Sequence, residues 1–150
     1  MCGILGLIDH QPNSERFKRF DAAINTLSHR GPDFQKTIIK PPVALGHARL
    51  SIIDLDQRSH QPMVDTTGRY TLVYNGEIYN FKELKHECEG LGYSFSTESD
   101  TEVLLVLFMH FGEQCLPKLQ GFFAFAIQQS HQPRPLMWLQ NGMEIFTTIL

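Results

Sequence analysis

Four features of this 150-residue sequence could do chemistry together: Cys2, Arg49, the Asn75-Gly76 pair and Asp100. A thiol has an ordinary pKa of about 8.5 and becomes a nucleophile when a base removes its proton. If Met1 is removed, Cys2 carries the free α-amino group, whose pKa of about 7.7 to 8.0 suits it to accept that proton and later return one. The alternative is that Cys2 is a small buried hydrophobe in a strand, as most free cysteines are.

The Asn75-Gly76 pair offers two hydrogen-bond donors, one from a side-chain amide and one from a backbone N–H. Two such donors stabilise the oxyanion that forms when a nucleophile attacks an amide carbonyl. Asn-Gly is also the strongest short signal for a hairpin turn. The two interpretations are compatible, because a turn can hold the donors in place.

Arg49 and Asp100 carry the charges that would recognise an amino acid by its α-carboxylate and α-ammonium groups. Arginine can bind a carboxylate through two parallel hydrogen bonds. Arg49 lies within an apolar stretch, where an unpaired guanidinium would be costly, although a surface position is the alternative. Asp100 falls in the first turn of an expected helix, so a favourable interaction with the helix dipole is the alternative for it.

The elements that must position these residues alternate between strands and helices. Short apolar runs predict strands at 2–9, 36–39, 43–53, 70–74 and 121–127. Apolar residues at three- and four-residue spacing predict helices at 14–28, 80–90 and 99–111, and a polar loop is expected at 54–69. Asn80 with Glu83, and Ser99 with Glu102, match the spacing of a capping box at a helix start. Strands interleaved with amphipathic helices predict an α+β domain.

The sequence resembles the glutaminase domain of class II glutamine amidotransferases, and most closely that of glutamine-hydrolysing asparagine synthetase. The resemblance is carried by Met1-Cys-Gly-Ile-Leu-Gly, His29-Arg-Gly-Pro-Asp33, Gly46-His-Ala-Arg-Leu-Ser-Ile-Ile-Asp54 and Tyr74-Asn-Gly-Glu-Ile-Tyr-Asn80. Ser99-Asp-Thr-Glu102 and Gly121-Phe-Phe-Ala-Phe-Ala126 extend it to about residue 127. It implies a four-layer αββα sandwich of the amino-terminal-nucleophile hydrolase type, which we expect to be incomplete at the C-terminus.

The resemblance also implies hydrolysis of glutamine to glutamate and ammonia through a thioester on Cys2. The implied catalytic residues are Cys2, Asn75 and Gly76. The implied glutamine-binding residues are Arg49, Leu50, Ser51, Ile52, Ile53, Asn75, Gly76, Glu77 and Asp100.

Composition favours a protein that acts on a small polar substrate. Charged residues make up 19% of the chain, the net charge is −3 and the basic residues are scattered, which argues against nucleic acid and anionic membranes as partners. The longest apolar runs are far below the roughly 20 residues that cross a bilayer, and no secretory signal is recognisable. We therefore expect a cytoplasmic protein. Three cysteines without metal-binding spacing predict reduced thiols and no metal site.

Side chains outside these motifs are expected to be structural. We expect His29, His47 and His60 to be structural or polar loop residues. Cys88 and Cys115 lie on apolar helix faces and are expected in the core.

The composition changes at about residue 128, which divides the chain into an incomplete amidotransferase domain at 1–127 and a divergent tail at 128–150. Residues 136–150 show neither helical nor strand periodicity. If residues 136–150 are back-translated with suitable synonymous codons and the DNA is read in a frame shifted by two bases, the result resembles the family's next strand. A frameshift near residue 128 is therefore one hypothesis. It would leave the second sheet with an uncovered edge.

The 150 residues contain no phosphate-binding loop, so ATP and Mg would belong to a synthetase domain that is absent, and no cofactor is expected in this chain. Glutamine is the expected small-molecule partner, and a separate synthetase domain or a second copy of the chain remains open. An inactive truncated remnant or a binding module is the main alternative function. The glutaminase piece of another class II amidotransferase is a third.

Overall fold

The computed structural model describes residues 2–50, 59–130, 136–140 and 148–149. Its first sheet has the strand order β2-β3-β1-β8. In chain order these strands are β1 (Gly3–Ile8), β2 (Phe34–Lys40), β3 (Val43–Arg49) and β8 (Thr148–Ile149). β3 pairs antiparallel with both β1 and β2, so β3 is central and its carboxyl end lies next to the start of β1.

The second sheet has the strand order β4-β5-β6-β7, and every neighbouring pair in it is antiparallel. Its strands are β4 (Met63–Val64), β5 (Tyr70–Ile78), β6 (Gly121–Gln129) and β7 (Leu136–Gln140). β5 and β6 pair over their full length, from Tyr70 opposite Gln129 to Ile78 opposite Gly121. This long ladder forms the centre of the second sheet.

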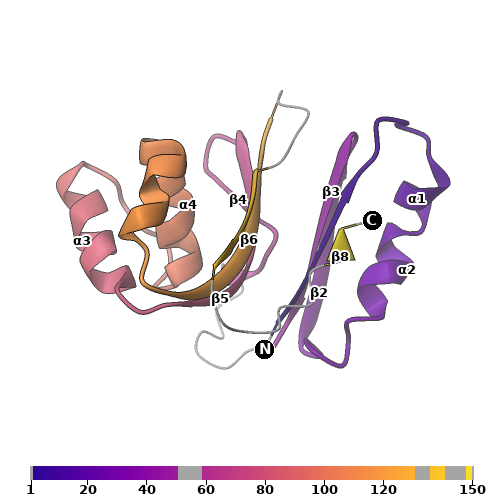
Figure 1. Cartoon of the computed structure of the whole chain (residues 1–150), viewed down its shortest axis with the longest axis horizontal. Coiled ribbons are helices and arrows are strands. Elements are labelled where there is room, and N and C mark those ends of the chain that lie inside the picture. The colour runs from indigo at the N-terminus through magenta and orange to yellow at the C-terminus, as the bar shows by residue number, and fades with distance from the viewer. Residues whose placement is uncertain (1, 51–58, 131–135, 141–147, 150) are drawn as a thin grey trace.

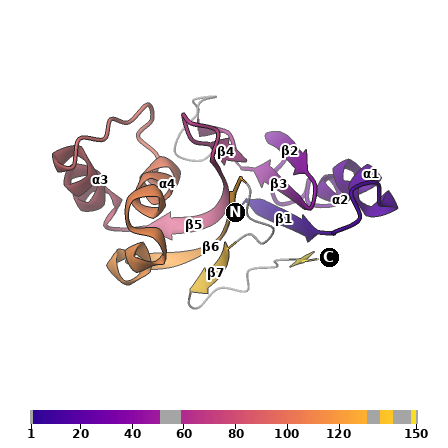
Figure 2. The same cartoon turned by 90° about the horizontal axis from the view of Figure 1, so that it is seen from above.

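Figure 1 shows the two sheets facing each other, with helices on both outer sides. The short helices α1 (Glu15–Lys18) and α2 (Phe20–Asn25) cover the first sheet. The longer helices α3 (Phe81–Gly90) and α4 (Asp100–Phe111) cover the second, as the view from above in Figure 2 also shows. A 3-10 helix, η2 (Gly112–Lys118), leads from α4 into β6. The structure confirms the expected mixture of helices and sheets. Among the described residues, no helix is long and apolar enough to cross a membrane.

Side-chain alternation along the strands separates three apolar clusters. On one face of the first sheet, Leu5 and Leu7 pack with Phe17, Phe20 and Ile24 from the helices. On its other face, a smaller cluster joins the two sheets, and it contains Ile4, Val43, Leu45, Val73, Ala124 and Ala126. The largest cluster lies between the second sheet and α3 and α4. The apolar cluster between the sheets is therefore smaller than the cluster under α3 and α4.

Two helix predictions are corrected in detail. The helix expected at 14–28 is broken at Arg19, which caps α1 and starts α2, and the chain continues in turns after Asn25. Asn80 precedes α3 but makes no side-chain capping bond. Its amide instead donates to the Lys118 carbonyl oxygen and accepts from the Gln120 N–H. The partners of Asn80 come from a distant segment, which local spacing could not reveal.

The tail expected to lack regular structure contains two strands. β7 pairs with β6 from Phe123 opposite Gln140 to Ile127 opposite Leu136. β8 pairs parallel with β1 through Thr148 and Ile149. β6 is therefore an inner strand and β7 is the last strand of the second sheet, because backbone pairing uses N–H and C=O groups that any sequence supplies.

Asp65 fixes the hairpin that leads into β5, and we expect its replacement by asparagine to destabilise the fold. Its carboxylate accepts hydrogen bonds from the Tyr70 N–H (2.6 Å) and the Thr67 N–H (2.9 Å). Burial raises the pKa of Asp65, but the hydrogen bonds from Thr67 and Tyr70 outweigh burial and leave the pKa below its ordinary value. A lowered folded-state pKa adds stability above the unfolded pKa, and that stability is lost as the pH falls.

Urea denaturation of Asp65→Asn should show a loss of about 1 to 3 kcal/mol at neutral pH. Between about pH 5 and pH 3, the wild-type chain should lose stability more steeply than the variant. Equal slopes in this range would show that Asp65 does not hold its charge through these hydrogen bonds.

Candidate active site

A cavity of about 470 Å³ lies where the ends of β1, β3, β5 and α4 come together. Seven of the residues singled out in the sequence line it: Cys2, Arg49, Leu50, Asn75, Gly76, Glu77 and Asp100. Three more, Ser51, Ile52 and Ile53, lie outside the described residues. Residues up to 98 positions apart in the chain, Cys2 and Asp100, thus share one cavity.

Cys2 immediately precedes β1 and lies beside the end of β3. The Leu50 backbone N–H points at the Cys2 sulfur, with 3.5 Å between nitrogen and sulfur. The thiol can in turn donate to the Leu50 carbonyl oxygen, at 3.8 Å. A backbone N–H directed at sulfur stabilises negative charge there, as a nucleophilic thiolate requires.

Gly31 allows the loop that carries it to lie directly against the end of β3. A Cβ atom at this position would lie 2.1 Å from the Ala48 carbonyl carbon and 2.4 Å from the Arg49 nitrogen. Two residues later, the Asp33 N–H donates to the Arg49 carbonyl oxygen at 3.1 Å. The His29-to-Asp33 segment therefore acts on the site indirectly, because it holds the backbone of Arg49.

Arg49 and His47 project from β3 toward the second sheet, on the face that also carries Val43 and Leu45. Only 7% of Arg49 and 1% of His47 is exposed. Burial, and then the Arg49 charge, lower the pKa of His47 to about 3. His47 is therefore neutral near pH 7 and a weak base. The sequence analysis expected His47 to be a structural or loop residue. The alternation of side chains along the strand from Val43 could have predicted that His47 is buried.

Asn75 and Gly76 lie within β5 and do not form a hairpin turn. They stand opposite Ala124 and Phe123 of β6, and the strand continues to Ile78. The long ladder to β6 outweighs the local preference of Asn-Gly for a turn. Asn75 points its side chain to the face between the sheets, where it is 8% exposed and lines the cavity.

Gly76 cannot carry a side chain without moving β6. A Cβ atom there would lie 2.3 Å from the Phe122 carbonyl oxygen and 2.5 Å from the Phe123 Cα. We expect Gly76→Ala to destabilise the chain by about 1 to 3 kcal/mol and to displace the backbone beside Asn75. Thermal unfolding measures the first effect, and ligand binding at the cavity measures the second.

Gly90 provides the matched control for Gly76, because a Cβ atom at Gly90 would meet nothing within 4 Å. Gly90→Ala at the end of α3 should change stability by less than about 1 kcal/mol. Similar melting temperatures for the two alanine variants would contradict the steric argument.

Asp100 is the first residue of α4, and its carboxylate reaches across to β5. One carboxylate oxygen accepts from the Tyr74 hydroxyl at 2.6 Å and from the Ile78 N–H at 3.1 Å. Burial raises the pKa of Asp100, while the hydrogen bonds from Tyr74 and Ile78 oppose the rise. A buried carboxylate held in this way can receive a ligand ammonium group.

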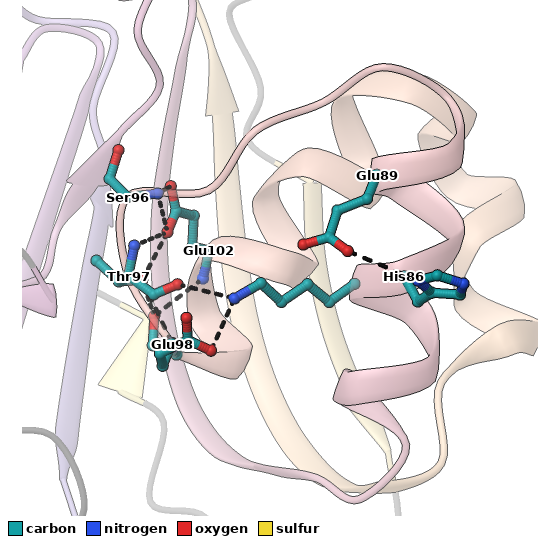
Figure 3. A network of polar contacts seen from close by, with 8 residues as sticks. His86, Glu89, Ser96, Thr97, Glu98 and Glu102 are labelled. Atoms are coloured by element: carbon teal, nitrogen blue, oxygen red, sulfur yellow. Dashed lines mark hydrogen bonds and ion pairs between the residues drawn. The ribbon is translucent and has the colours of Figure 1, made fainter.

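The loop before α4 is held by a network of polar contacts (Figure 3). The Ser99 hydroxyl accepts from the Glu102 N–H at 3.3 Å, which confirms half of the predicted capping box, while the Ser99 N–H donates to the Thr97 hydroxyl in place of Glu102. The Glu102 carboxylate accepts from the Ser96 N–H (2.9 Å) and the Thr97 N–H (2.7 Å). Because Glu98 and Ser99 line the cavity, this network fixes one of its walls.

Two residues of the expected polar loop at 54–69 are buried parts of the site. Ser59 and Gln61 are each 6% exposed and line the cavity. The Gln61 side chain accepts from the Tyr74 N–H at 2.5 Å and donates to the Thr101 hydroxyl at 3.4 Å. The polar composition of this segment predicted a solvated loop. Gln61 is instead buried, with its polar atoms hydrogen-bonded to partners that are distant in the chain. Across the described part of the chain, no group of three or more His, Cys, Asp or Glu side chains is placed to hold a metal ion.

The similarity to known proteins covers almost the whole chain. The family described as "Glutamine amidotransferase domain" matches residues 1–138. Asparagine synthetase [glutamine-hydrolyzing] 1 of Bacillus subtilis (strain 168) is 41% identical over 133 residues, which cover 85% of this chain and 20% of that protein. Asparagine synthetase B [glutamine-hydrolyzing] of Escherichia coli (strain K12) is 37% identical over 133 residues, covering 88% of this chain and 24% of that protein.

The fold is similar to that of the glutamine phosphoribosylpyrophosphate amidotransferase from B. subtilis, solved with ADP and GMP. The TM-score is 0.64 at 23% identity, and the match covers 85% of this chain and 34% of that one. The chain spans between a fifth and a quarter of the length of the two asparagine synthetases named above. By the family match over residues 1–138, the chain belongs to the class II glutamine amidotransferase domain family and is related to asparagine synthetases.

Proposed function

We propose that this chain is the glutaminase part of an asparagine-synthetase-like protein and that it hydrolyses glutamine to glutamate and ammonia. The observation that carries the proposal is the shared cavity, in which Cys2 lies with Asn75-Gly76, Arg49 and Asp100. These residues supply a nucleophile, two oxyanion donors and two charges complementary to an amino acid. We further propose that the layered sheets and helices are an αββα sandwich of the amino-terminal-nucleophile hydrolase type.

The proposed reaction begins with Met1 removed and Cys2 at the amino terminus. The Cys2 sulfur attacks the side-chain amide carbon of glutamine, and the α-amino group accepts the thiol proton. His47 is a poor alternative base, because its pKa of about 3 leaves it with little affinity for a proton. The Asn75 side-chain amide and the Gly76 N–H bind the resulting oxyanion.

Collapse of this intermediate breaks the carbon–nitrogen bond, and the α-ammonium group of Cys2 returns its proton to the leaving ammonia. A thioester between Cys2 and the glutamyl group remains. Water then attacks the thioester carbonyl while the α-amino group accepts a proton from the water. Glutamate leaves and the Cys2 thiol is restored, so no cofactor is required in this chain.

Glutamine would be recognised by the two charged ends of the cavity. Arg49 is the proposed partner of the α-carboxylate, together with the backbone of Leu50 and of Ser51, Ile52 and Ile53. Glu77 and Asp100 are the proposed partners of the α-ammonium. Use of the ammonia by a synthetase domain, and a cytoplasmic location, follow only from the asparagine-synthetase relationship and belong to the proposal.

Three measurements on one purified sample test the proposal. Intact mass shows whether Met1 is absent. A glutamine-like electrophile such as 6-diazo-5-oxo-norleucine should label the chain once, on Cys2, and ammonia should be released from glutamine. A folded chain that lacks Met1 but neither takes the label nor releases ammonia would leave the non-catalytic remnant as the better description.

A further inference from the structure

One carboxylate links the proposed ammonium-binding end of the glutamine site to the strand that carries the proposed oxyanion donors. The same Asp100 oxygen accepts from the Tyr74 hydroxyl (2.6 Å) and from the Ile78 N–H (3.1 Å). These two donors flank the β5 segment 75–77, which carries the proposed oxyanion donors. Asp100 is therefore linked to β5 on both sides of that segment.

Tyr74 is itself held firmly in this arrangement. It is 3% exposed, and its backbone N–H donates to Gln61, which also reaches the Thr101 hydroxyl on α4. Burial and the negative charge of Asp100 raise the pKa of Tyr74, so the hydroxyl stays protonated and acts as the donor. The Tyr74 hydroxyl thus has a fixed place and a fixed role in the hydrogen bond.

We propose that Tyr74 is a positioning residue for glutamine recognition: its hydroxyl orients the Asp100 carboxylate toward the substrate α-ammonium. This inference rests on the proposed function, and it adds a residue to which the sequence assigned no role. Tyr74 does not have to touch the reacting atoms. Loss of its hydroxyl removes the side-chain donor and leaves Asp100 with backbone N–H groups, among them that of Ile78, so the carboxylate is freer to turn away from the cavity.

The test uses binding, so that it does not depend on catalysis. In a Cys2→Ala background, calorimetry compares glutamine with 5-amino-5-oxopentanoate, which has the same amide and carboxylate but no α-ammonium. We expect Tyr74→Phe to weaken glutamine binding by about tenfold and to change binding of the des-amino amide by less than about twofold. Tyr70→Phe is the matched control, since Tyr70 lies on the same strand and packs against Phe108 away from the cavity.

The pH dependence of glutamine binding adds a measurement that a purely structural role would not affect. The hydrogen bond from Tyr74 opposes the rise in the Asp100 pKa, so its removal should raise that pKa further. Glutamine binding requires ionised Asp100, so affinity falls as the pH drops through the pKa of Asp100. This fall in affinity should therefore occur at higher pH in Tyr74→Phe but not in Tyr70→Phe. The other charged or titratable groups that line the cavity are Arg49, His47, Glu77, Tyr79, Glu98 and Cys2, the last being alanine in this assay, and Lys85 pairs with Glu98 at 2.7 Å.

A second replacement covers the case in which Tyr74→Phe does not fold. Site-specific 3-fluorotyrosine at position 74 keeps the hydroxyl and makes it a stronger donor, so the fall in affinity should occur at lower pH. Unchanged glutamine affinity and pH dependence in either folded replacement would overturn the role of Tyr74. Equal weakening for both ligands would also overturn it, because it would indicate general damage to the cavity.

The binding assay separates this inference from the proposed reaction. If the Cys2→Ala chain binds glutamine as described but the wild-type chain releases no ammonia, the proposed hydrolysis fails and the role of Tyr74 stands. If the wild-type chain is active and Tyr74→Phe behaves like Tyr70→Phe, the role of Tyr74 fails alone. Absence of glutamine binding in the Cys2→Ala chain overturns the role of Tyr74, and absence of ammonia release by the wild-type chain as well overturns both.

Discussion

Cys2→Ala is expected to lower the rate of ammonia release from glutamine by on the order of 10⁴-fold or more, because no other group at this position could form the thioester. The cavity should remain, since alanine fits wherever cysteine does. Glutamine binding is therefore expected to persist while turnover is lost. Ammonia release and labelling by the glutamine-like electrophile measure the effect directly.

Cys88→Ala is the control for the Cys2 variant. Cys88 is fully buried in α3, and burial raises the pKa of its thiol, which makes it unreactive. Its removal should cost some stability but leave both labelling and ammonia release intact. Labelling that persists in Cys2→Ala and disappears in Cys88→Ala would refute the assignment of the nucleophile.

Asn75→Ala is expected to lower kcat by about 10²- to 10³-fold with a much smaller change in KM. The Asn75 amide would bind the oxyanion, which exists only after attack, so its loss affects the transition state more than the bound substrate. This corresponds to roughly 3 to 4 kcal/mol of lost stabilisation of the transition state. Steady-state kinetics with glutamine separate the two constants.

Asn80→Ala gives a comparison in which an asparagine amide is lost outside the cavity. The Asn80 amide bonds the Lys118 carbonyl oxygen at 2.9 Å and the Gln120 N–H at 3.0 Å, so the variant should lower stability by about 1 to 2 kcal/mol. Its kcat should stay near the wild-type value at a temperature where it is folded. A rise in KM without a fall in kcat for Asn75→Ala would instead indicate that Asn75 binds the ground state.

The local pattern of the sequence was sufficient for most elements. Continuous apolar runs predicted β1 and β6, and the Ser99-Glu102 spacing predicted the start of α4. These elements depend on contacts between neighbours in the chain and on burial of one face. The spacing of apolar residues indicates both. The predictions failed where partners are distant, as at Asn80, whose amide bonds residues 118 and 120 in place of its own helix.

The sequence by itself determined which residue types are available for chemistry: a cysteine after the first methionine, an Asn-Gly pair, and two opposite charges. Only the tertiary structure brought Cys2, Asn75 and Asp100 into one cavity, because that requires pairing of β1 with β3 and of β5 with β6, and packing of the two sheets. It also decided that Asn-Gly lies in a strand, that His47 and Gln61 are buried, and that Tyr74 holds Asp100. These features depend on partners far away in the chain, and the local sequence pattern does not predict such partners.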